Sequence, residues 1–122
     1  MLRPSYSKKG DALNASVKID AGVCGFQTTA EVSSSDGQTV LFRISSDCVK
    51  IKKMAEALCE HGPVNAFVEM RPGGKGLLLG NDSPVRDGRC AGCVVPLGLF
   101  KGMQVAVGMA LPRDVNISLD KK

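Results

Sequence analysis

The chain has 122 residues, of which 43% are hydrophobic and 23% are charged. This length and balance allow a buried core in a single domain and exclude an intrinsically disordered protein. The net charge of +4 is mild, and the chain lacks the dense basic stripe with interleaved aromatic residues that would favour nucleic acid as a partner.

Residues 1–13 are mostly polar and basic, and they are predicted to form a flexible leader before a single domain at residues 14–122. The leader contains no apolar core of signal-peptide length, which favours a cytoplasmic protein. In that compartment the five cysteines are expected to be free, metal-bound or redox-active rather than joined in structural disulfides.

Three segments in the first half of the domain alternate between apolar and polar residues, as half-buried strands do. They span residues 14–21, 26–33 and 40–44. A connection with two glycines and Cys24 joins the first two, and the Asp36-Gly37 pair is typical of a hairpin turn before the third. The pattern therefore predicts three consecutive antiparallel strands with one apolar face.

A helix is predicted next, from a capping residue within Ser45–Asp47 to Glu60 or His61, with Gly62 and Pro63 as the stop signal. Its apolar residues recur with the spacing of one helix face: Ile51, Met54, Ala55 and Leu58. This helix would cover the apolar face of the strands.

The remainder contains one weak region and two further elements. Residues 63–89 have loop composition, with Phe67 to Met70 compatible with a short strand or a helical turn. A second helix is predicted from Val95 to Leu111, and Val115 to Leu119 alternates as a last strand beside the first. The elements together predict an α+β fold, an antiparallel sheet of about four strands with two helices packed on one face.

The second helix is strongly apolar, since its polar stripe contains only Lys101, Gln104 and Gly108. It is nevertheless shorter than the roughly 20 residues of a membrane span, so no membrane partner is expected. One interpretation is a central core helix. The other is a homodimer through this helix, in which residues near Met103 and Val107 meet their copies.

Four cysteines lie at breaks between the predicted elements, whereas Cys59 lies within the first helix and is expected to be a small buried hydrophobe. The four are Cys24, Cys48, Cys90 and Cys93. If both helices direct their N-termini toward the turn with Cys24, the four sulfurs can converge. Four thiolates satisfy a tetrahedral zinc site or an iron–sulfur cluster.

Several short stretches resemble an uncharacterised family of small cysteine-containing proteins found mainly in anaerobic microbes. They are Ala21-Gly-Val-Cys-Gly-Phe26, Ser46-Asp-Cys48, Cys93-Val-Val-Pro96 and Ala110-Leu-Pro-Arg-Asp-Val115. The resemblance implies that Cys24, Cys48 and Cys93 belong to one motif set, and it implies no activity because the family is a domain of unknown function.

Three functions remain open from the sequence. The first is a protein that binds zinc or an iron–sulfur cluster through Cys24, Cys48, Cys90 and Cys93. The second is a thiol-redox protein in which Cys90 and Cys93 of the Cys-x-x-Cys motif cycle between dithiol and disulfide. The third is a non-catalytic homo-oligomeric interaction module.

Overall fold

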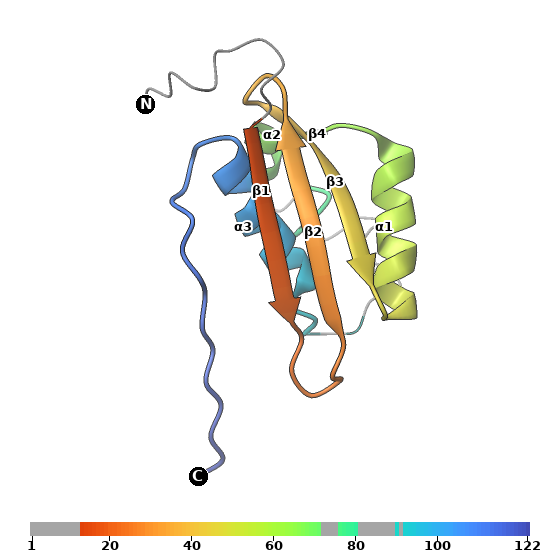
Figure 1. Cartoon of the computed structure of the whole chain (residues 1–122), viewed down its shortest axis with the longest axis vertical. Helices are drawn as coiled ribbons and strands as arrows, with labels where there is room; N and C mark the ends of the chain where they lie inside the picture. Colours follow the sequence, from red (N-terminus) through yellow and green to blue (C-terminus); the bar gives the residue numbers. More distant parts are fainter. Residues whose placement is uncertain (1–12, 72–75, 81–89, 91) are drawn as a thin grey trace.

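The fold is seen in a computed structural model, which describes residues 13–71, 76–80, 90 and 92–122 (Figure 1). The elements follow in the order β1 (Leu13–Asp20), β2 (Gln27–Ser34), β3 (Thr39–Ser46), α1 (Val49–His61), β4 (Val64–Asn65), α2 (Ala66–Glu69) and α3 (Val95–Ala106). Most of the predicted leader and the predicted loops at residues 72–75 and 81–84 lie outside the described residues.

The sheet has four strands in the order β1-β2-β3-β4, and all neighbouring strands are antiparallel. The predicted alternation holds in β2, where Thr28, Ala30 and Val32 are buried and the residues between them are mostly exposed. The fourth strand is the two-residue β4, in which Val64 pairs with Val40. This pairing lies in the region for which the sequence predicted only loops and one short element.

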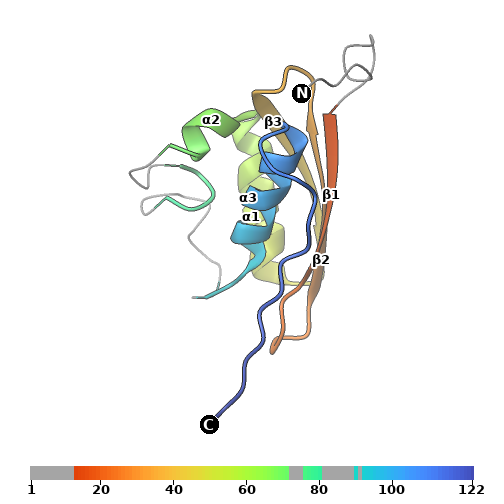
Figure 2. The same ribbon diagram turned by 90° about the vertical axis from the view of Figure 1, so that its left-hand side faces the viewer.

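Both long helices lie on one face of the sheet, as Figure 2 shows from the side. α1 packs on β3, and α3 packs on β1 and β2. The core forms between the sheet and this helix layer, with Leu58 from α1 and Leu99 from α3 among its buried side chains. The prediction of an α+β fold with two helices on one face is therefore confirmed.

The N-terminus of α1 differs from the prediction because its N-cap residue is Cys48 rather than a residue of Ser45–Asp47. The Ser46 hydroxyl oxygen instead accepts a hydrogen bond from the Cys48 backbone N–H at 3.1 Å. At the other end Gly62 is the C-cap residue with a φ of 85°, so the helix ends where the sequence predicted. Three of the four predicted apolar positions are fully buried, and Ala55 is partly buried.

α3 ends at Ala106, five residues before the predicted end at Leu111. Gly108 has a φ of 80°, and its N–H donates to the Val105 carbonyl while the Met109 N–H donates to the Gln104 carbonyl. These two bonds form a Schellman motif, the usual way in which a glycine with positive φ terminates a helix. Gly108 is therefore the stop signal, and Pro112 lies beyond it.

The predicted last strand at Val115 to Leu119 is wrong, because the described chain forms no strand or helix after α3. Residues 111–122 are all exposed, although the apolar side chains still alternate. An alternating pattern indicates a strand only when a neighbouring strand accepts its backbone hydrogen bonds. In this chain no described strand pairs with the segment.

The interior of α3 supports the interpretation as a core helix. Met103 and Val107, which the dimer interpretation placed at the interface, are only 0% and 5% exposed within this single chain, and a homodimer through this helix stays a prediction. A Cβ added to Gly98 would lie 2.5 Å from Ile19 Cδ1, and one added to Gly102 would overlap Val17. The two glycines therefore bring the helix close to the sheet.

The short segment after α1 is fixed by polar contacts to the backbone. The Asn65 side chain accepts hydrogen bonds from the Phe67 and Val68 N–H groups and so caps α2. The buried Glu69 carboxylate accepts from the N–H groups of Leu77 and Leu78 at 2.7 and 2.8 Å. These bonds join α2 to the next described residues and satisfy a carboxylate that would otherwise be costly to bury.

The predicted hairpin turn is stabilised by Asp36. Its carboxylate accepts hydrogen bonds from the backbone N–H groups of Thr39 and Gln38, at 2.8 and 2.9 Å. These bonds favour the ionised form and lower the pKa of the Asp36 carboxyl to about 2. Gly37 follows with a φ of 75°, which confirms the conformation expected of an Asp-Gly pair.

The close contact between α3 and β1 makes Gly102→Ala a destabilising substitution. The added methyl group overlaps Val17, and overpacking of this kind costs about 1–3 kcal/mol of unfolding free energy. Chemical denaturation of the wild type and the variant measures the loss.

The matched control repeats the substitution in a variant that lacks the overlapped Val17 side chain. In a Val17→Ala background the overlapping methyl group is absent and the nearest remaining atom is Val32 Cγ2 at 3.3 Å, so Gly102→Ala should cost less there, with a coupling energy on the order of 1 kcal/mol. Equal costs in the two backgrounds would show that the contact does not limit this position.

Candidate cysteine site

The strand order brings the β1–β2 turn and the start of α1 to the same end of the sheet. Asp20, the last residue of β1, pairs with Gln27 at the start of β2. At the same level Thr28 pairs with Ser46, the last residue of β3. Cys24 lies within the turn and Cys48 lies two residues after Ser46, so both are at this end.

The contacts of α3 direct its N-terminus to this end as well. Gly98 lies over Ile19 and Gly102 lies over Val17, so the helix runs antiparallel to β1. Its first residues therefore lie near the end of β1, and Cys93 comes two residues before the helix begins. Figure 1 shows the turn and the N-termini of both long helices at the lower end of the molecule.

The Cys-x-x-Cys motif is folded as a turn. The Cys93 backbone N–H donates to the Cys90 carbonyl oxygen at 3.1 Å, and Gly92 between them has a φ of 78°. A second contact joins this turn to α1, since Lys50 Nζ donates to Cys90 Sγ at 3.5 Å. Nothing in the sequence pattern signalled Lys50, because it lies in a run of lysines typical of a solvated helix face.

The four cysteines at this end differ in exposure, and all are free thiols. Cys48 and Cys93 are partly buried and pack against the hydrophobic core, whereas Cys24 and Cys90 are exposed. Cys59 is also exposed, so the expectation that it is a buried hydrophobe is wrong. The site therefore has two cysteines fixed at the core and two carried by exposed turns.

The structure does not gather these sulfurs into a ligand shell. Among the residues that the structure describes, which include all five cysteines, no group of three or more His, Cys, Asp or Glu side chains is placed to hold a metal ion. The packing meets the condition set for convergence, since both helix N-termini lie at the end of the sheet with the Cys24 turn, and the metal site stays a prediction.

Both helix N-termini at this end lack a side-chain cap. Neither Cys48, the N-cap of α1, nor Val94, the N-cap of α3, makes a side-chain hydrogen bond to the first turn. The first N–H groups of a helix have no intrahelical partner and carry partial positive charge, so they favour anions nearby. This end can therefore stabilise negative charge on sulfur.

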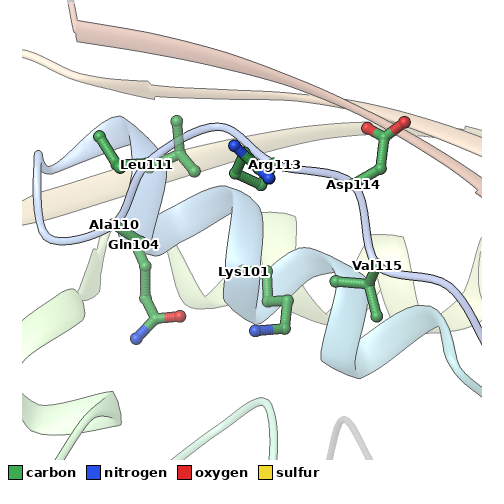
Figure 3. A pocket seen from close by; sticks show the side chains of 8 residues that line it. Lys101, Gln104, Ala110, Leu111, Arg113, Asp114 and Val115 are labelled. Carbon is green, nitrogen blue, oxygen red and sulfur yellow. The ribbon is translucent and has the colours of Figure 1, made fainter.

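A different hollow lies on the flank of α3 (Figure 3). Its volume is about 240 Å³, and Lys101, Gln104 and Val105 of α3 line it together with residues of the following chain. This is below the roughly 300–1,000 Å³ of ordinary ligand sites, and its lining includes no cysteine or histidine. None of the described helices is long and apolar enough to pass through a membrane.

The family of unknown function DUF6951 matches residues 15–119. The chain belongs to this family. The match extends from β1 through the exposed segment after α3, and it includes the cysteine end described above. The predicted membership of an uncharacterised family is thereby confirmed. Comparison with curated proteins and with solved structures found no match for the chain.

The difference in exposure predicts an order of chemical modification in the reduced, metal-free protein. Cys24 and Cys90 should react with a neutral alkylating reagent before Cys48 and Cys93, whose side chains are partly covered by the core. Peptide mass spectrometry over a time course measures the order, with the exposed Cys59 as an internal reference. Modification of Cys48 as fast as Cys59 would contradict the packing described for α1.

Proposed function

We propose that the protein binds zinc or an iron–sulfur cluster through Cys24, Cys48, Cys90 and Cys93. The observation that carries the proposal is that three separate segments bring these four cysteines to one end of the sheet. Four cysteine thiolates are a complete ligand set for tetrahedral zinc and for common iron–sulfur clusters.

The electrostatics of this end support the same ligand set. A site with four thiolates carries more negative charge than zinc or an iron–sulfur core neutralises, so it needs donors around the sulfurs. The uncapped N-termini of α1 and α3 supply backbone N–H groups, and Lys50 supplies an ammonium group at Cys90. These are the neighbours expected of metal-bound thiolates.

The ligands would contribute unequally to the site. Cys48 and Cys93 are held by their contacts with the core, so they would form the fixed half. Cys24 and Cys90 are exposed and would have to move inward. The Cys24 turn has room for such movement, since no described atom lies within 4 Å of a Cβ built on Gly22 or Gly25.

The proposal includes a reducing cellular environment for the cysteines. A cytoplasmic location would keep the thiols reduced and available to a metal. An origin in anaerobic microbes, which the resemblance described above implies, would suit an oxygen-sensitive cluster.

The test is metal analysis after purification without oxygen. The wild type should contain zinc, or iron with acid-labile sulfide, in a fixed ratio to the chain. Cys24→Ser and Cys48→Ser each remove one proposed ligand and should lower that content several-fold. Cys59→Ser is the matched control, because Cys59 is an exposed cysteine of α1 outside the set. Equal metal content in all three variants would exclude the shared site.

A thiol-redox function through Cys90 and Cys93 is the second candidate. The observation that favours it is the turn in which the Cys93 N–H bonds to the Cys90 carbonyl, since this turn keeps the two residues close. Oxidation would join the two sulfurs, and a small disulfide such as oxidised glutathione would take up the two electrons and the two protons as two thiols.

The redox function predicts a specific disulfide in metal-free protein equilibrated with oxidised and reduced glutathione. Peptide mapping should find a bond between Cys90 and Cys93, formed reversibly, while Cys24 and Cys59 stay reduced or carry only mixed disulfides. Cys93→Ser should abolish the bond and leave Cys90 with bound glutathione. Disulfides distributed at random over the five cysteines would contradict this function.

A further inference from the structure

The segment after α3 exposes an unusual amount of apolar surface. Val115, Ile117 and Leu119 are 54%, 63% and 91% exposed, and Met109 and Leu111 before them are exposed as well. The residues between the first three are Asn116 and Ser118, so one side of the extended chain is apolar and the other is polar. This is the pattern of a half-buried strand without its neighbour.

The sheet of the same chain has a free edge that is long enough to pair with this segment. β1 is the first strand in the sheet order, and its eight residues pair only with β2 in the part of the chain that the structure describes. An unpaired edge of this length presents a row of backbone N–H and C=O groups, which accept an added strand readily. β4 at the opposite edge has only two residues.

α3 lies close to the place where an added strand would lie. It packs on β1, the edge strand, and on β2, and Gly98 and Gly102 make its closest approach to β1. A helix about 10–12 Å wide reaches about 5–6 Å to each side of its axis, and neighbouring strands are about 4.8 Å apart. The flank of α3 with the partly buried Val105 is therefore within reach of the next strand position.

The chain's own C-terminal segment runs past β1 without pairing with it. After α3 the chain turns back and runs past β1, and its C-terminus lies beyond the β1–β2 turn (Figure 1). In the described chain the residues after α3 form no strand and pair with no residue of β1. That stretch includes Pro112, which has no N–H to donate, and it packs against α3 loosely around the hollow of Figure 3.

We propose that the segment Val115 to Leu119 pairs with the β1 edge of a second copy of this chain. Each copy then supplies one strand and one edge, so a twofold exchange closes and leaves neither unpaired. The apolar side chains Val115, Ile117 and Leu119 are covered by the α3 flank of the partner copy, and Asn116 and Ser118 face solvent. The family match extends to Leu119, so this segment belongs to the family's domain and is not an appended tail.

The exchange is tested by two substitutions on opposite sides of the segment. Ile117→Lys places a charge on the side that would be covered, and Ser118→Lys places the same charge on the side that would face solvent. Sedimentation at tens of micromolar should give a dimer for the wild type and for Ser118→Lys, and a monomer for Ile117→Lys. Circular dichroism should show that all three are folded, because Ile117 and Ser118 are exposed and neither belongs to the core cluster.

Lysine cross-linking identifies the surfaces that meet. In the wild type, links from Lys18 on β1 to Lys121 or Lys122 should occur in the covalent dimer. A wild type that sediments as a monomer would overturn the proposal, whether the segment is free or pairs with its own β1. A dimer that survives Ile117→Lys, or that Ser118→Lys disrupts equally, would also overturn it.

Discussion

The contact of α3 with β1 through two glycines is the constraint on which most of this structure depends. Because Gly98 and Gly102 carry no side chain, the helix backbone approaches Ile19 and Val17 more closely than any larger residue would permit. This contact fixes the direction of α3, and with it the end of the sheet at which the helix begins. It also brings the helix close to an edge strand, so that one flank is within reach of the next strand position.

The connections of the strands determine the other half of the cysteine end. An antiparallel β1-β2-β3 order requires the first turn and the exit from β3 to lie together, and α1 begins within three residues of that exit. The sheet topology thus places Cys24 and Cys48 at the same end of the sheet, and the packing of α3 places Cys93 there as well. The candidate site is a consequence of the fold as a whole rather than of one continuous motif.

The sequence predicted most of this arrangement because the relevant signals are local. Alternation identified β1 to β3, and the spacing of Ile51, Met54 and Leu58 identified α1. The failures arose where local and non-local signals compete. The apolar run after Ala106 suggested a longer helix, but Gly108 stops it because its positive φ allows a Schellman motif. The alternation at Val115 to Leu119 was real, but pairing depends on a distant strand.

The details of the candidate site were harder to predict than its location. Exposure depends on which side of a helix faces the sheet, and Cys59 lies on the outer side although Leu58 beside it is buried. The contact between Lys50 and Cys90 joins residues that are 40 positions apart, so no periodicity could indicate it.

The division of the cysteines between core and turns has a consequence for stability. Cys48 and Cys93 are held by packing whether or not a ligand is present, since both contact the buried core. Cys24 and Cys90 lie on exposed turns, so a metal that joined all four would cross-link those turns to the core. Such binding requires the folded arrangement of three separate segments, and any binding free energy would therefore add to the stability of the fold.

A pair of redox thiols within one turn would not add to the stability of the fold in this way, because Cys90 and Cys93 are already neighbours in the unfolded chain. The dependence of unfolding on bound metal is thus a property that separates the two candidate functions on thermodynamic grounds.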